Sequence, residues 1–496
     1  MCGILASFGT TNIDENAFRS VLKLTTHRGP DDTGALFGDG FALGHNRLSI
    51  VDVAGGHQPL SCSQAQLYGV SNGEIYNHRN IRDRNYPDYP YKTRSDAEVL
   101  LPAFRKKGAA MVADLDGMFA FVLTDGRELL AARDPLGIKP LYYGHDGDQL
   151  YFGSEIKTLI PLAKTIREFP QGHFYHSKTG FQPYYTINPQ PVCIHDEAQA
   201  IREIRRTLET SVRKRLMSDV PVGVFLSGGL DSSIIAALMR QSIPELHSFS
   251  VGVHGSPDLE AARKVANHIG TIHHEYVYTE DEMIEVLPDV INHLESFDPA
   301  LVRSAVPCYM VSRLAARHVK VVLSGEGADE LFGGYSYFSQ FKDSKDLRTE
   351  SIRILNGLHN MNLQRVDRMT MAHSLEGRVP FLDIDFIETV LKIDPELKLH
   401  GVYPQEKGLL RKAVEDLLPR EIVWRKKMEF AQGCGSSRVL EQMAEKEISQ
   451  ETLDHARSKQ PAITGKESLY YFNLFKNRFD HPDAVGMVAT WNGTLH

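Results

Sequence analysis

The residue types at the start of the chain could provide an N-terminal nucleophile. Cys2 follows the initiator methionine, and removal of that methionine would leave a thiol beside a free α-amine. An α-amine has a pKa of about 7.7–8.0, so one residue would carry both the nucleophile and its general base. A thiolate is a good nucleophile toward an acyl carbon. Because a cysteine at the second position is most often incidental, the interpretation needs support from other residues.

Other polar residues in the first hundred positions could complete a pocket for an α-amino acid. Asn72 and Gly73 end a predicted strand and offer a side-chain amide and a backbone N–H as an oxyanion hole. Arg47 ends another predicted strand and could bind a carboxylate through two hydrogen bonds. Asp96 opens a predicted helix and could hold an ammonium group. Taken alone, the Asn72-Gly73 pair is more typical of a tight turn.

A glycine-rich loop between a predicted strand and a predicted helix could bind phosphate. Residues 226–233 read Leu-Ser-Gly-Gly-Leu-Asp-Ser-Ser. Glycines let backbone N–H groups approach phosphate oxygens, and the N-terminus of the following helix adds positive charge. Asp231 could hold Mg²⁺ against those phosphates. The loop lacks the lysine of a Walker A motif, and a generic turn is the competing interpretation.

A second loop of similar composition follows a later strand. Residues 324–335 read Ser-Gly-Glu-Gly-Ala-Asp-Glu-Leu-Phe-Gly-Gly-Tyr. Ligands of open α/β sheets bind at the carboxyl ends of the strands, so both loops are predicted to share one crevice, with Asp329 as a second Mg²⁺ ligand. Both aspartates could instead cap their own loops. Lys427 is a candidate to neutralise phosphate charge, and a solvated basic run is a close alternative.

The pattern of apolar residues divides the chain into two halves. The first half has short apolar runs separated by turn residues, which predicts an α+β domain with helices after Asp14 and over about 95–107. The predicted strands there are 2–8, 41–48, 67–72, 118–123, 129–132 and 151–153. A break with three prolines at 182–197 follows, and then a helix from about Asp196 with one apolar stripe.

The second half alternates strands and helices, which is typical of a parallel α/β sheet. The predicted strands are 222–226, 247–251, 276–278 and 319–323, and the predicted helices are 232–239, 259–269, 281–294 and 305–316. From about residue 345 onward the pattern is mainly helical.

Composition narrows the class of protein. Of the 496 residues, 42% are hydrophobic and 24% are charged, which is typical of a globular chain. The 55 basic and 63 acidic residues leave a net charge of −8, which gives no support for nucleic-acid binding. No apolar run is long enough for a membrane span, and the five scattered cysteines do not form a disulfide framework. These features predict a soluble, cytoplasmic protein without a membrane partner.

Segments of the first half resemble the class II glutamine amidotransferases. They are Met-Cys-Gly-Ile at 1–4, His-Arg-Gly-Pro-Asp at 27–31, Arg-Leu-Ser-Ile-Val at 47–51, Gln-Pro-Leu at 58–60, Asn-Gly-Glu-Ile-Tyr-Asn at 72–77, Ser-Asp at 95–96 and Arg-Asp-Pro-Leu-Gly at 133–137. The resemblance implies a four-layer (αββα) glutaminase domain over 2–190, in which Cys2 attacks the glutamine amide and releases ammonia. Asn72 and Gly73 would form the oxyanion hole. The implied glutamine-binding residues are Arg47, Leu48, Ser49, Ile50, Val51, Glu74 and Asp96.

The loop at 226–233 resembles the pyrophosphate loop of ATP pyrophosphatases. With the segments at 256–263, 273–275 and 374–383, the chain is similar to the glutamine-hydrolysing asparagine synthetases of the B type. The resemblance implies an α/β ATP pyrophosphatase domain over 196–496, with ATP as substrate and Mg²⁺ as cofactor. The implied nucleotide-binding residues are Leu226, Ser227, Gly228, Gly229, Asp231, Ser232, Val251, Ser324, Gly325 and Lys427, and the implied metal ligands are Asp231 and Asp329. Glu326 would support formation of an acyl-adenylate and its attack by ammonia.

The same resemblance implies that aspartate, glutamine and ATP become asparagine, glutamate, AMP and pyrophosphate through β-aspartyl-AMP, in a homodimer. A related enzyme that amidates another carboxylate is one alternative, although residues 302–307 are similar to the asparagine synthetase version and favour aspartate. A non-catalytic binding protein is another, and the reactive residues Cys2, Asp231, Glu326 and Asp329 argue against it. The run His-His-Glu at 273–275 does not match H-E-x-x-H, so it predicts no zinc site.

Overall fold

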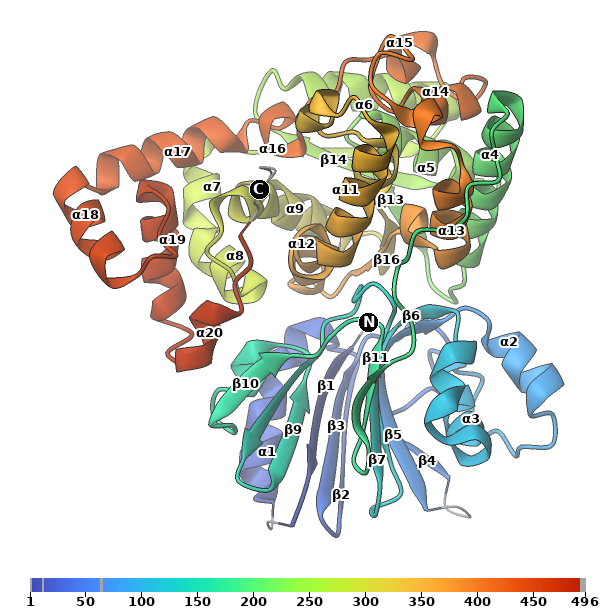
Figure 1. Cartoon of the computed structure of the whole chain (residues 1–496). Coiled ribbons are helices and arrows are strands. Elements are labelled where there is room, and N and C mark those ends of the chain that lie inside the picture. Colours follow the sequence, from blue (N-terminus) through green and yellow to red (C-terminus); the bar gives the residue numbers. More distant parts are fainter. Residues whose placement is uncertain (1, 11–12, 63–65, 491–496) are drawn as a thin grey trace.

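The computed structural model describes residues 2–10, 13–62 and 66–490, which fold into two halves that lie one above the other (Figure 1). The first half contains two antiparallel sheets, and the second contains one parallel sheet among helices. An extended segment leads from the first half to helix α4 (Glu197–Lys214) of the second. The predicted fold class, an α+β domain followed by a parallel α/β domain, is confirmed.

The first half has the predicted four layers. Its first sheet has the strand order β10-β8-β9-β1-β3-β2, and its second sheet has the order β12-β11-β7-β6-β5-β4. The strands of the first sheet are β1 (Gly3–Phe8), β2 (Asp32–Gly38), β3 (Phe41–Arg47), β8 (Tyr142–Asp146), β9 (Gln149–Gly153) and β10 (Thr165–Glu168). Those of the second are β4 (Leu60–Cys62), β5 (Leu67–Ile75), β6 (Gly117–Thr124), β7 (Leu129–Arg133), β11 (His173–His176) and β12 (Gly180–Pro183).

The alternation of side chains along β1 explains the layering. Ile4 and Ala6 are buried among residues of both sheets, whereas Leu5 packs with the apolar face of α1 (Glu15–Leu22) on the other side. Asp14 caps α1, as the sequence predicts, because its carboxylate accepts hydrogen bonds from two backbone amides of the first turn. On the far side of the second sheet lie the short α2 (His78–Asn80) and α3 (Leu100–Lys107), which a 3₁₀ turn over Asp96–Val99 precedes.

The sheet of the second half has the strand order β15-β14-β13-β16-β17, and all of its pairs are parallel. Its strands are β13 (Val222–Phe225), β14 (His247–Gly252), β15 (Ile272–Val277), β16 (Val321–Leu323) and β17 (Glu376–Arg378). The helices between these strands are α5 (Leu230–Arg240), α6 (Pro257–Ile269), α7 (Glu280–Glu285), α8 (Leu287–Leu294), α9 (Pro299–Ala315), α10 (Ala328–Phe332), α11 (Ser344–Gly357) and α12 (Asn362–Met371).

Several elements differ from the sequence prediction. Strands β2, β4, β8, β10, β11 and β12 are not among the predicted strands, and β15 begins four residues before the predicted 276. The predicted helix over 281–294 is two helices, α7 and α8. Helix α9 begins six residues before the predicted 305, because Asp298 caps it and Pro299 occupies its first turn. Strand β17 lies in the region predicted to be mainly helical, since a three-residue strand forms only through its pairing with β16.

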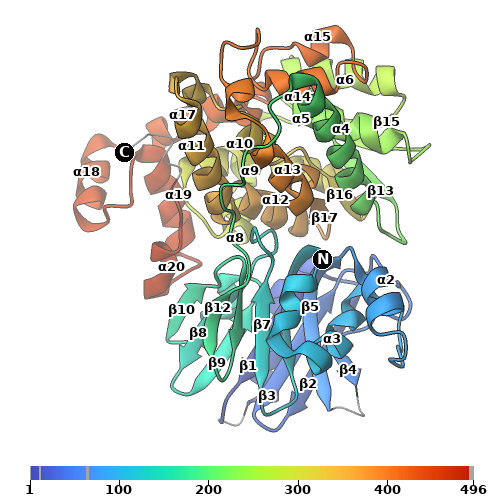
Figure 2. The same ribbon diagram turned by 45° about the vertical axis from the view of Figure 1, so that its right-hand side comes forward.

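The last helices extend from the second half back to the first. They are α13 (Ile384–Lys392), α14 (Gly408–Ala413), α15 (Arg420–Val423), α16 (Phe430–Gly433), α17 (Ser436–Glu447), α18 (Gln450–Lys459), α19 (Lys466–Lys476) and α20 (Pro482–Gly486). Figure 2 shows α20 beside β10, and the carboxylate of Asp483 accepts a hydrogen bond from the backbone amide of Ile166 at 2.8 Å. Within the described ranges, no helix is long and apolar enough to cross a membrane.

Candidate active sites

Cys2 lies where the two halves of the molecule meet. It precedes β1, is buried, and its backbone nitrogen donates a hydrogen bond to Asn72 Oδ1 at 2.9 Å. Burial raises the pKa of the thiol, but the nearby His45 and other interactions outweigh it and bring the pKa down to about 7. A large fraction of Cys2 is therefore thiolate near neutral pH, which is the reactive form.

The two predicted oxyanion-hole residues lie on β5 beside Cys2. Since Asn72 Oδ1 faces the nitrogen of Cys2, its Nδ2 is left as a buried donor with no partner among the described residues. Gly73 has φ of +136°, and a Cβ at this position would lie 1.9 Å from the carbonyl oxygen of Met118. The site therefore admits only glycine after Asn72, and an unused amide donor lies next to the thiol.

Two carboxylates predicted to bind the substrate amine are buried near this point. Burial raises the pKa of Asp96 to about 6, although its Oδ2 accepts a hydrogen bond from the Ile75 amide at 2.7 Å. Burial, together with the neighbouring Glu376 and Asp96, raises the pKa of Glu74 well above its usual range. Glu74 Oε2 has no hydrogen-bond partner in the described structure. Two buried acids, with the Arg378 guanidinium 3.4 Å from Glu74, form an environment that suits an ammonium group.

The other predicted glutamine-binding residues either form hydrogen bonds within the first half or pack in or against the apolar core. The guanidinium of Arg47 donates to the carbonyl oxygens of Val51, Asp52 and Val53 at 2.6–3.2 Å, which folds this loop around the arginine. The side chains of Leu48 and Ile50 belong to the apolar core shared by both halves, and Val51 packs against that core. These three residues can therefore offer a ligand mainly their backbone groups. The backbone amide of Ser49 already donates to Asp31 at 2.7 Å.

A buried ion-pair network joins Cys2 to the second half. Arg28 Nε donates to the carbonyl oxygen of Cys2 at 3.0 Å, while its Nη1 lies 2.9 Å from both Glu155 and Asp367. Arg368 Nη1 lies 2.9 Å from the same Glu155 oxygen. Breaking a fully buried pair by removing one partner is strongly destabilising, so this network holds the position of Cys2 relative to α12.

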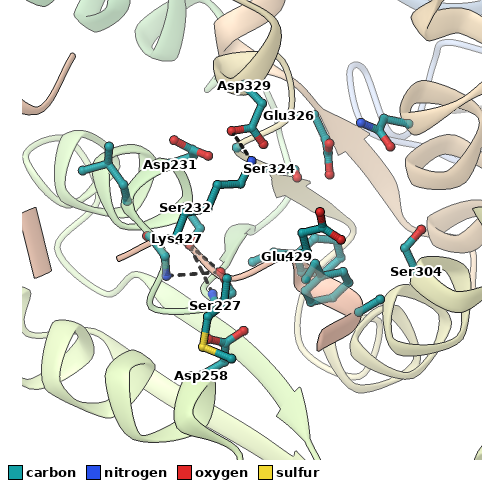
Figure 3. Close-up of a pocket in the computed structure, with 18 of the residues that line it drawn as sticks. Ser227, Asp231, Ser232, Asp258, Ser304, Ser324, Glu326, Asp329, Lys427 and Glu429 are labelled. Carbon is teal, nitrogen blue, oxygen red and sulfur yellow. Dashed lines mark hydrogen bonds and ion pairs between the residues drawn. The ribbon is translucent and has the colours of Figure 1, made fainter. Parts of the chain in front are cut away.

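The two glycine-rich loops of the second half line one cavity of about 350 Å³ at the carboxyl ends of β13, β14 and β16. Predicted residues that line it are Leu226, Ser227, Gly229, Asp231, Ser232, Val251, Ser324, Gly325, Glu326, Asp329 and Lys427. Gly228 is not among the lining residues. The loops touch each other, because a Cβ on Gly325 would lie 2.8 Å from the Cβ of Asp231. Figure 3 shows the labelled polar side chains around this cavity.

Charged side chains occupy one side of the cavity. Lys407 Nζ lies 2.6 Å from carboxylate oxygens of both Asp231 and Asp329. Lys427 Nζ lies 2.7 Å from Asp329 (Figure 3). Burial raises the pKa of Asp231, whereas the two lysines hold the pKa of Asp329 well below its usual range despite burial. Two carboxylates thus face one position of positive charge, which suits phosphate groups accompanied by a cation.

Sequence reasoning missed Lys407 and Arg365. Lys407 is buried and has a left-handed backbone with φ of +57°, a costly conformation that packing around it must maintain. Arg365 of α12 forms an ion pair with Glu326 and lines the same cavity. Neither residue lies in a glycine-rich loop or beside a predicted strand end, so no local pattern in the sequence marks them.

Comparisons with known proteins agree with this two-part construction. The family model described as a glutamine amidotransferase domain matches residues 1–209, and the one described as asparagine synthase matches residues 203–352 and 339–470. The fold and these matches define an amidotransferase domain joined to an asparagine synthase domain.

Full-length relatives have the same arrangement. The chain is 41% identical to asparagine synthetase B (glutamine-hydrolysing) of Escherichia coli, with 98% of this chain and 93% of that protein covered. It is 42% identical to a probable glutamine-hydrolysing asparagine synthetase of Schizosaccharomyces pombe, with 99% and 96% covered. The chain belongs to the glutamine-hydrolysing asparagine synthetase family.

Proposed function

We propose that this enzyme amidates the β-carboxylate of L-aspartate with ammonia released from glutamine, and that it uses ATP to activate the carboxylate. The products would be asparagine, glutamate, AMP and pyrophosphate. The observation that carries the proposal is the presence, in one chain, of a thiol beside an unused amide donor and of a cavity built from two phosphate-type loops.

In the first half, the thiolate of Cys2 attacks the side-chain amide carbon of glutamine. The developing oxyanion accepts hydrogen bonds from Asn72 Nδ2 and the Gly73 N–H, which gain strength as charge builds up. The α-amine freed by removal of Met1 passes a proton to the leaving ammonia. Glu74 and Asp96 would hold the α-ammonium of the substrate, and Arg47 would bind its carboxylate.

In the second half, the β-carboxylate of aspartate attacks the α-phosphorus of ATP, so that pyrophosphate leaves and β-aspartyl-AMP forms. Activation is needed because a carboxylate oxygen is a poor leaving group, whereas AMP is a good one. Leu226 and Val251 offer an apolar surface to the adenine, and Ser227, Ser232 and Ser324 offer hydroxyl donors to the phosphates. Lys407 and Lys427 stabilise the charge that accumulates on the departing pyrophosphate.

The carboxylates of Asp231 and Asp329 fit Mg²⁺, because oxygen ligands are those that this ion prefers and both already face one cation position. When bound with ATP, Mg²⁺ supplies positive charge at the phosphate oxygens. Glu326, which is paired with Arg365, would accept a proton as ammonia attacks the adenylate. Asp231→Ala and Glu326→Ala should each cripple synthesis and spare glutamine hydrolysis in the other half.

The decisive experiment labels the β-carboxylate of aspartate with oxygen-18 and identifies all products by mass spectrometry. The adenylate route places one label in AMP and releases pyrophosphate. Label in inorganic phosphate, with ADP as the nucleotide product, would rule out the adenylate. Aspartate should be compared with other carboxylic acids in a pyrophosphate-release assay, since equal turnover of another acid would identify a related amidating enzyme. The homodimer implied by the sequence resemblance is tested by light scattering.

A further inference from the structure

Three histidines from separate segments meet on the parallel sheet, near the start of β14. His247 begins β14, His274 lies on β15, and His318 follows the end of α9. The nucleotide cavity is lined by Phe249, Ser250 and Val251 of the same strand, so Phe249 contacts both that cavity and His274. One ring nitrogen from each histidine lies within 4.8 Å of those of the other two.

Two of the rings already share one proton position. His247 Nδ1 and His274 Nε2 are 2.9 Å apart, which is hydrogen-bond distance, and the two ring planes are nearly parallel at 7°. In such a contact one nitrogen donates and the other offers its lone pair. Two nitrogens bound to one tetrahedral Zn²⁺, at about 2.0–2.1 Å each, lie roughly 3.3 Å apart. To bind one ion, the two nitrogens would have to separate by about 0.4 Å, and both rings would have to turn so that each lone pair points at the ion instead of at the other nitrogen.

The third ring can close the site from the solvent side. His318 is exposed, and its ring centroid lies 3.9 Å from that of His274. Because the side chain is exposed, rotation about its own torsions can bring a nitrogen to the point between the other two. Phe249 stacks against His274 on the protein side and gives the cluster an apolar backing.

The neighbouring His273 and Glu275 bind other partners, and among the described residues neither is hydrogen-bonded to the ring nitrogens of His247, His274 or His318. Both ring nitrogens of His273 are within 3.1 Å of the hydroxyls of Ser248 and Ser250, and Glu275 is bound by Arg263.

We propose that His247, His274 and His318 form a binding site for a divalent transition-metal ion, with Zn²⁺ as the reference ion. Imidazole nitrogens suit Zn²⁺, Ni²⁺ and Cu²⁺, whereas Mg²⁺ prefers oxygen, so the site does not compete with the Asp231–Asp329 pair. Three protein ligands leave a fourth position for water. The ion would tie β14, β15 and the segment after α9 together at one end of the sheet.

The test uses the full-length, tag-free protein after treatment with a chelator, without nucleotide. Titration with Zn²⁺, followed by calorimetry, should give one site per chain, and Co²⁺ should give the strong visible absorption of a four-coordinate nitrogen site. A Cys193→Ser background removes the exposed thiol as a competing ligand. Replacing His318 or His274 with alanine should weaken Zn²⁺ binding by about 10–100-fold or more. Loss of an outer-shell partner already costs that much, and these residues would be direct ligands.

His455→Ala, which removes an exposed histidine on α18, is the matched control and should bind like the parent. Because His318 is exposed, His318→Ala should fold normally. Circular dichroism of each variant, His318→Ala and His274→Ala, checks its folding separately. Failure of the parent to bind Zn²⁺, or unchanged affinity in a folded His318→Ala protein, would overturn the proposal.

Discussion

The carboxylate of Glu74, beside the candidate glutamine site, lies 3.4 Å from the guanidinium of Arg378 on β17 of the other half. The backbone carbonyl of the same Arg378 accepts a hydrogen bond from the amide of Ser324 at 2.9 Å, at the start of the second nucleotide loop. One buried residue therefore contacts both candidate sites. If Arg378 moved when one site was occupied, its contact with the other site would change as well.

We expect this contact to couple glutamine hydrolysis to occupation of the synthetase site. In the parent enzyme, aspartate and ATP should change kcat/KM for glutamine hydrolysis, and couplings of this kind are typically about 5–150-fold. Arg378→Lys retains a buried positive charge but not the planar group that reaches Glu74. In this variant, the ratio of kcat/KM for glutamine hydrolysis with and without aspartate and ATP should therefore fall toward one. Arg353→Lys, at an exposed arginine, is the control. An unchanged ratio in Arg378→Lys would show that Arg378 does not carry the coupling.

Cys2→Ala should abolish hydrolysis of glutamine and glutamine-dependent synthesis, because it removes the nucleophile. Synthesis from added ammonium salt should continue, since the synthetase cavity is built from other residues. The assay measures asparagine produced from glutamine and from ammonium salt. Mass spectrometry of the parent enzyme should find Cys2 as the first residue. Glutamine-driven synthesis in a pure Cys2→Ala sample would refute the role of this thiol.

The pKa of about 7 at Cys2 predicts how its alkylation depends on pH. Thiolate forms as pH rises through the pKa, so the rate of reaction with iodoacetamide should rise and reach half its maximum near pH 7. An ordinary cysteine reaches that point near pH 8.5. Burial raises the pKa of Cys308 to about 12, so this residue should remain unmodified. Peptide-resolved mass spectrometry separates the two, and a midpoint above pH 8 at Cys2 would contradict the prediction.

Asn72→Asp should slow glutamine hydrolysis by about 10²–10³, the usual cost of one oxyanion donor. Aspartate retains an oxygen to accept the hydrogen bond from Cys2 nitrogen but has no Nδ2 donor. Ammonium-dependent synthesis should stay close to normal and thus serves as the internal control for folding. Equal losses in both activities would indicate a structural defect rather than loss of a donor.

Lys407→Met should reduce synthesis from either nitrogen donor by about 10²-fold or more, because it leaves Asp231 and Asp329 facing each other without the ammonium that joins them. Glutamine hydrolysis should persist and reports on folding. Lys412→Met, at a partly exposed lysine of the same helix, should behave like the parent. Normal pyrophosphate release by Lys407→Met would remove this residue from the nucleotide site.

Local sequence determined most of the secondary structure and the residue types at both sites. Apolar runs predict β1, β3, β5, β6, β7 and β9 of the first half but not its other strands, and the capping residues Asp14 and Asp196 place the starts of their helices correctly. The two glycine-rich loops were recognisable because each follows a strand and their chemistry depends on backbone groups near one another along the chain. The family resemblance, which rests on short contiguous segments, was likewise available from the sequence.

Only the tertiary structure decided which distant residues share a site. Lys407 and Arg365 reach the cavity from outside any recognisable motif, and Arg378 reaches Glu74 across 304 positions. His274 belongs to a run that matches no linear metal motif, yet His247 and His318 lie beside it because strand pairing and the end of α9 bring them there. Long-range packing has no periodicity in the sequence, so such contacts are set by the fold as a whole.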